Sequence, residues 1–142
     1  MNFIIFATFI IFTSILSMTI KRHNRSEKNQ QEQFWEREKR ANQVRRKPLD
    51  DLDYVTIPLE NLPTAVLAED VIVQDCLNTL VSLSREKIVN LAGYTNTDLK
   101  LTYGTANITA LSQYDQNFTL LAQTLQKWAD TLHNAGYMAE SV

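Results

Sequence analysis

The chain has 142 residues, a formal net charge of −2 and a single cysteine. A chain of this length has room for one domain at most, and one cysteine excludes an intrachain disulfide. The charge is divided unevenly, because residues 21–47 hold ten Lys and Arg against four Asp and Glu, whereas residues 48–142 hold four against twelve. The acidic part argues against nucleic-acid binding, which needs Lys and Arg to replace phosphate counterions.

Residues 3–20, FIIFATFIIFTSILSMTI, carry no charge and are mostly apolar. As an α-helix this run spans roughly 27 Å, close to the roughly 30 Å hydrocarbon core of a bilayer. It therefore predicts a transmembrane helix. A cleavable signal peptide is the alternative, although it calls for a basic start and a small-residue cleavage site, and only Met1 and Asn2 precede this run.

Four basic residues follow the apolar run at once, and nothing charged precedes it: Lys21, Arg22, Arg25 and Lys28. Because basic residues favour the cytoplasmic side of a membrane helix, we expect a single-pass protein of the cell membrane whose C-terminal part faces the cytoplasm. Anionic lipid headgroups on that side would attract the same residues.

Residues 21–47 predict a basic juxtamembrane helix, because they contain no Gly or Pro and are rich in good helix formers. Pro48 is expected to end it. Phe34 and Trp35 are adjacent large aromatics in this polar segment, which makes them candidate interaction residues. The segment is either a solvated spacer or a helix that docks through these two residues, on the membrane surface or on the rest of the chain.

Residues 48–63 form a proline-containing segment that is too apolar for a free linker. Prolines at 48, 58 and 63 exclude a continuous helix. We interpret this segment as a strap lying across a helical domain, with a short strand as the alternative.

Residues 64–142 predict a small helical domain. The first helix shows apolar residues at helical spacing, with Asp70 or Glu69 near its start, and one of Thr95, Asn96 and Thr97 is expected to cap a short helix that begins near Asp98. A final helix is expected over about 112–134. The expected core contains Leu77, Leu80, Leu121, Leu125 and Trp128, with Cys76 among them.

The sequence offers no candidate for catalysis. His23 and His133 lack a second ligand at metal-binding spacing, and Cys76 lies on an apolar stripe, where a thiol behaves as a small hydrophobe. Three glycines leave little scope for a phosphate-binding loop. We expect no catalytic residue, no metal, no cofactor and no small-molecule substrate. Glycosylation sequons at Asn24, Asn107 and Asn117 carry little weight.

The last eighteen residues, LQKWADTLHNAGYMAESV, show a spaced pattern of apolar and small residues around a glycine. The pattern comprises Leu125, Trp128, Ala129, Leu132, Gly136, Met138, Ser141 and Val142. It resembles the first helix, turn and start of the second helix of a tetratricopeptide repeat, a family of protein-binding scaffolds. Such a repeat needs neighbouring copies to bury its face, so the last repeat would be incomplete.

The whole layout resembles uncharacterised bacterial single-pass membrane proteins with a tetratricopeptide-like helical domain, of which this chain would be a short or truncated member. Three segments carry that likeness: 34–42, 54–63 and 93–104.

We therefore expect an all-α protein: a transmembrane helix, a charged juxtamembrane helix and a small tetratricopeptide-like domain. The expected function is that of a membrane-tethered adaptor or scaffold that is not an enzyme. An exported or cell-envelope protein anchored by an uncleaved signal sequence is the alternative. Because the last repeat lacks its second helix, Trp128 and Leu132 are further candidate interaction residues, for a partner protein or for self-association.

Overall fold

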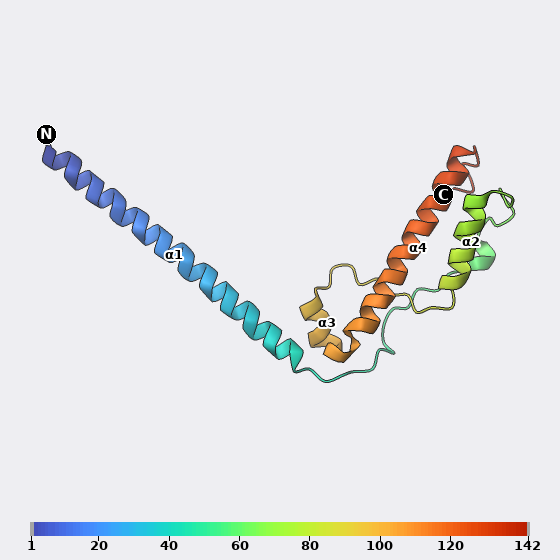
Figure 1. Cartoon of the computed structure of the whole chain (residues 1–142), viewed down its shortest axis with the longest axis horizontal. Helices are drawn as coiled ribbons and strands as arrows, with labels where there is room; N and C mark the ends of the chain where they lie inside the picture. The colour runs from blue at the N-terminus through green and yellow to red at the C-terminus, as the bar shows by residue number, and fades with distance from the viewer. Residues whose placement is uncertain (1, 142) are drawn as a thin grey trace.

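The structure, a computed structural model, describes the backbone of residues 2–141 and the side chains of residues 6–141. The described part of the chain is all-α and contains no β-strand. Its elements in order are α1 (Asn2–Asn42), the 3-10 helix η1 (Leu59–Asn61), α2 (Val71–Leu83), α3 (Asn96–Tyr103), the 3-10 helix η2 (Thr105–Asn107) and α4 (Ile108–Asn134). Figure 1 shows α1 projecting from a smaller body made by the other helices.

Helix α1 is one continuous helix of 41 residues, whereas the sequence predicts two helical segments that meet near residue 20. The change from apolar to charged residues alters what surrounds the helix but does not break it, since no Gly or Pro occurs before Pro48. The helix ends at Asn42, and Lys39 and Arg40 in its last turn complement the helix dipole.

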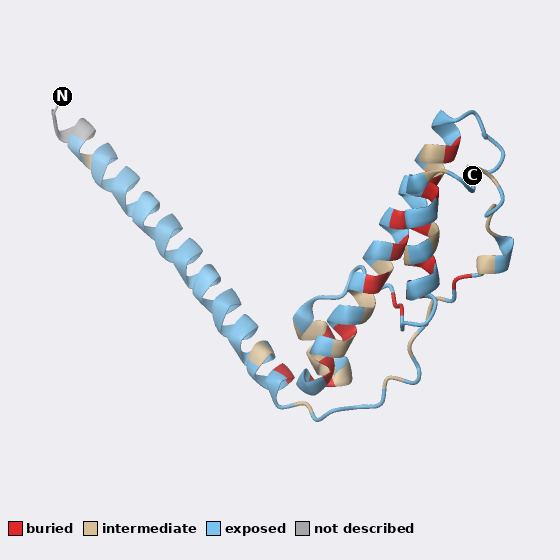
Figure 2. Cartoon of the chain, turned by 45° about the vertical axis from the view of Figure 1, so that its right-hand side comes forward, coloured by how far each residue is buried: buried red, intermediate tan, exposed pale blue. Residues whose placement is uncertain are grey.

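The large apolar side chains in the first half of α1 are uncovered, each between 47% and 68% exposed. They are Phe6, Phe9, Ile10, Ile11, Phe12, Ile15, Leu16, Met18 and Ile20. Figure 2 shows exposure along almost the whole helix up to its C-terminal end. Searched over the described residues alone, the helices include none that is long and apolar enough to cross a membrane. Residues 3–5, with which the predicted span begins, have side chains outside the described set.

Helices α2 and α4 lie side by side and form the main core (Figure 1). Asp70 caps α2, because its carboxylate accepts hydrogen bonds from the backbone N–H groups of Ile72 and Val73. The first core cluster contains Ile57, Val73, Cys76, Leu80, Leu83, Ile88, Leu121, Trp128 and Leu132. The expected core is confirmed for Leu80, Leu121, Trp128 and Cys76, and Leu77 packs against it. Leu125 is 37% exposed, so its place in the expected core is wrong.

The segment over residues 48–63 lies across both parts of the core, as a strap would. Val55, Leu59 and Leu62 pack against the first cluster. Leu49, Leu52 and Tyr54 pack against a second cluster, made of Val89, Leu91, Leu99 and Leu111. The alternative of a short strand amounts to one isolated bridge between Tyr54 and Val89.

Helix α4 begins at Ile108, four residues before the expected start, and ends in a glycine turn. Gly136 has φ +91°, its N–H donates to the carbonyl of His133, and the N–H of Tyr137 donates to that of Leu132. This pattern is a Schellman motif, which stops a helix. Residues 138–141 form turns rather than the start of the expected second repeat helix, because so short a segment cannot offset the cost of helix nucleation.

Candidate interaction surfaces

The C-terminal end of α1 is fixed to α3 by charged side chains that lie about sixty residues apart in the sequence. The Glu38 carboxylate accepts a hydrogen bond from Thr97 Oγ1 at 2.7 Å and forms an ion pair with Lys100. Arg37 pairs with Asp98. Ala41, one turn further along α1, is 0% exposed. We call the contact of residues 37–47 with residues 97–107 the joint.

The second half of the joint is built from backbone groups and one buried amide. Asn107 is 0% exposed. Its Nδ2 donates to the carbonyl oxygens of Lys47 at 2.7 Å and Tyr103 at 2.8 Å, and its Oδ1 accepts from Arg46 Nε at 3.0 Å. The N–H of Lys47 donates to the Tyr103 carbonyl at 3.0 Å. The chain that leaves α1 is therefore held against the end of α3.

Two carboxyl groups of the joint have shifted pKa values. Hydrogen bonds from Lys100 and Thr97 hold the pKa of Glu38 below its usual value. Asp98 has a lowered pKa because the side chain and backbone of Thr95 donate to it. The Asp98 backbone N–H donates in turn to Thr95 Oγ1, which makes a capping box at the start of α3. Both carboxyl groups are therefore charged at neutral pH.

The structure places Phe34 and Trp35 on α1, one turn before the joint. Both are exposed, at 54% and 60%, and their rings meet edge to face with centroids 5.4 Å apart. The pair docks on no other described part of the chain, so it remains an accessible aromatic surface next to the joint.

Trp128 and Leu132, the other two candidate interaction residues, are only 3% and 2% exposed. They lie in the first core cluster, where α2 and the strap cover them. The apolar face of α4 is therefore covered from within the chain, and the structure does not bring these residues together with Phe34 and Trp35.

A groove of about 440 Å³ lies beside Trp128, between residues 61–63 of the strap and residues 139–141. Its lining is largely apolar and includes Leu125 and Ala129. The indole Nε1 of Trp128 is buried and has no hydrogen-bond partner. With under 1 Å² of exposed surface, that atom is closed to any occupant of the groove.

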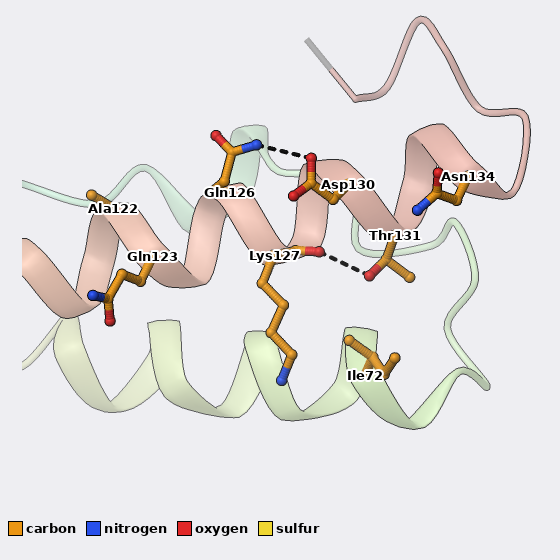
Figure 3. A pocket seen from close by; sticks show the side chains of 8 residues that line it. All are labelled: Ile72, Ala122, Gln123, Gln126, Lys127, Asp130, Thr131 and Asn134. Atoms are coloured by element: carbon orange, nitrogen blue, oxygen red, sulfur yellow. Dashed lines mark hydrogen bonds between the residues drawn. The ribbon is translucent and has the colours of Figure 1, made fainter.

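A shallower groove of about 610 Å³ runs along the outer side of α4 above the start of α2 (Figure 3). Figure 3 shows Lys127 extending from α4 toward α2 and Ile72 lying below Thr131. Lys127 forms an ion pair with Asp75 at 2.9 Å, which raises its pKa. Gln126 in its lining donates to the Asp130 carboxylate at 2.9 Å. The groove is wide open to solvent, so it lacks the enclosure of a small-molecule site.

The one cysteine and the possible metal ligands of the described residues can be placed in the structure. Cys76 is 1% exposed, and burial raises the pKa of its thiol, which favours the neutral thiol over the thiolate. Among the described residues, no three His, Cys, Asp or Glu side chains gather closely enough to hold a metal ion. Of the three sequons, only Asn24 is exposed, because Asn107 and Asn117 are buried and hydrogen-bonded.

Sequence reasoning missed the joint. Glu36 and Lys39 look no different in the sequence from Arg37 and Glu38, since all four belong to one charged helix. Ala41 is a small apolar residue between larger polar ones, which was only a weak indication that this part of the helix is buried.

Comparisons with protein-family models, with curated proteins and with solved structures find no match to this chain.

Proposed function

We propose that this protein is a membrane-tethered adaptor without catalytic activity. Its single membrane helix would be the apolar run of residues 3–20, and its helical domain would face the cytoplasm and bind a partner protein. The observation that carries this proposal is the asymmetry of α1. Its first half exposes a continuous apolar surface, whereas its other end is fixed to the domain by the joint.

The charges of α1 support the same arrangement. The basic residues follow the apolar run directly, as expected at the cytoplasmic end of a membrane helix. From Ile20 to Ala41 a helix rises roughly 31 Å. The exposed part of α1 would hold the domain at about that distance from the hydrocarbon core, and the joint would transmit this spacing to α3 and α4.

The exposed Phe34–Trp35 pair supports an adaptor role, because adjacent aromatics are favoured as anchors in protein interfaces. In this proposal the pair contacts the partner, and residues 64–142 form a small tetratricopeptide-like helical domain. Trp128 and Leu132 serve the core.

Membrane fractionation tests the anchor. The full chain should remain in the membrane pellet after alkaline extraction, and a chain lacking residues 2–20 should be released. Release of the full chain would contradict the anchor.

Labelling of intact cells tests the orientation. A Gln116→Cys chain should react with a membrane-impermeant thiol reagent only after permeabilisation, and Cys76 can stay in place because it is buried. Reaction in intact cells would support the exported alternative instead.

Photo-crosslinking tests the partner surface. A photoreactive residue at Trp35 should give a discrete crosslinked product, and the same residue at the neighbouring exposed Gln33 should give much less. Equal products at both positions would mean that the aromatic pair is not the contact.

A further inference from the structure

Four cations occupy the first two turns of α1 after the apolar run, and the protein leaves them largely unpaired. Lys21, Arg22 and Arg25 are exposed and form no ion pair with any described residue. Lys28 reaches Glu32 only at 3.9 Å, with both side chains more than 60% exposed. Charge on this part of α1 is therefore available to a ligand outside the chain.

These four cations share one face of α1. At about 100° of rotation per residue, they fall within an arc of about 120°. Arg37, Glu38 and Ala41, which α1 uses in the joint, are centred about 180° around the helix from that arc. Because α1 is continuous between the two sets, the basic face and the domain-bearing face point in opposite directions.

We propose that this basic face binds the phosphate groups of anionic lipids, and that the binding leans α1 so that the domain is held on the side of the helix away from the bilayer. The inference rests on the proposed function, since it needs residues 3–20 in the membrane. Charge complementarity identifies the occupant: the four side chains stand directly beside the apolar run, where lipid headgroups would be.

The four cations of this face lie closer to the membrane than the other cations of α1. Lys28 is roughly 12 Å of helix rise beyond Ile20, whereas Lys39 is roughly 28 Å beyond it. The headgroup layer extends about 5–7 Å beyond the hydrocarbon core, and its charges act over a further screening length of about 8 Å at physiological ionic strength. The four cations nearest the membrane therefore feel the lipid surface, and Lys39 and Arg40 lie beyond its range in an upright helix.

The test uses the full chain reconstituted in vesicles of phosphatidylcholine alone or with one third phosphatidylglycerol. Energy transfer is measured between a dye at Gln116→Cys and a dye on the lipid headgroups. Alkaline washing and flotation with the neutral vesicles come first. A chain that fails to stay with neutral vesicles overturns the membrane anchor, and the inference falls with it.

Two variants distinguish the effect of the number of positive charges from the effect of the helix face on which they lie. The first, K21Q/R22Q/R25Q/K28Q, removes the charges. The second, R22H/H23R/R25S/S26R/K28Q/Q30K, keeps the composition and moves three cations to within about 70° of the centre of the domain-bearing face.

Phosphatidylglycerol should lower energy transfer in the native chain, because it fixes the rotation of the leaning α1 at which the domain lies above the helix, whereas neutral lipid leaves all rotations open. It should leave the first variant unchanged and raise transfer in the second. Salt near 1 M, where the screening length is about 3 Å, should abolish each change. An inserted native chain that does not respond to anionic lipid overturns the inference, and so does a second variant that responds as the native chain does.

Discussion

Gly104 lies directly against the main chain of Arg45: a Cβ atom at position 104 would stand 2.4 Å from the Arg45 carbonyl oxygen. Gly104 also has φ +88°, a conformation that other residues adopt at a cost. The close approach occurs where the chain leaving α1 passes the end of α3. Glycine at this position is thus required twice, by its backbone conformation and by the space available.

Gly104→Ala should therefore destabilise the protein more than Gly93→Ala, its matched control. Gly93 has φ +91° but nothing within 4 Å of a Cβ, so its substitution should cost only the left-handed backbone strain, about 1–2 kcal/mol. Urea unfolding of a 21–142 fragment, which keeps the joint and both core clusters, measures the difference. Equal losses in the two variants would show that the contact with Arg45 is unimportant.

Asn107→Ala should open the joint, because it leaves the Lys47 and Tyr103 carbonyls and the Arg46 guanidinium without their shared partner. The Tyr103 carbonyl keeps the hydrogen bond from the Lys47 N–H, so the expected cost is that of the lost hydrogen bonds, about 0.5–1.5 kcal/mol each. Hydrogen exchange at the Lys47 N–H should become faster. Asn24→Ala, an exposed substitution on α1, is the control and should stay within about 0.5 kcal/mol of the native stability.

Acid should weaken the joint before it unfolds the core. The pKa values of Glu38 and Asp98 are lower in the folded protein than the ordinary values of 4.5 and 3.8. Their contribution to stability is therefore complete above those ordinary values, and it is lost as the pH falls through the lowered pKa values.

Spin labels at Gln33→Cys and Thr119→Cys can report on this change. The distance distribution between them should broaden as the pH falls below the ordinary values of 4.5 and 3.8, while helix content persists. Glu38→Gln should broaden it already at neutral pH. A distribution that stays narrow down to the pH of global unfolding would mean that the two carboxylates do not hold the joint.

Trp128→Ala should cost about 3–5 kcal/mol, because it removes a large buried side chain from between α2, α4 and the strap. Trp128→Phe should cost much less, since it keeps a ring and removes an indole N–H that has no partner. Urea midpoints of the 21–142 fragment compare the two. If Trp128→Ala unfolds at the same urea concentration as the native fragment, the last turns of α4 contribute nothing to the core.

Much of the fold follows from local patterns in the sequence. The Asp70 cap, the Thr95 cap and the apolar face with Cys76 and Leu80 all depend on residues a few positions apart. The packing of the strap on the helices could also be predicted, because its prolines exclude a helix and its apolar residues must be buried.

The joint could not be predicted in this way. Glu38 and Lys100 are 62 positions apart, and both resemble ordinary surface charges until the chain is folded. The sequence predicts that Trp128 belongs to the core. It does not show that α2 and the strap cover this face of α4, so Trp128 and Leu132 also stood as candidate interaction residues. The exposure of Leu125 was missed for a related reason. It lies at core spacing on α4 but faces the groove between the strap and residues 139–141.

Because α1 is continuous, the position of a residue along the helix also determines the direction in which its side chain points. One residue inserted between Lys28 and Phe34 would turn everything beyond it by about 100° and lengthen the helix by about 1.5 Å. Seven inserted residues would nearly restore the original direction, because they complete almost two turns, and would add about 10 Å. If the function depends on the direction in which the domain faces, only insertions or deletions of about whole helical turns should be tolerated in this segment. If it depends only on the distance of the domain from the membrane, tolerance should not follow the helical repeat.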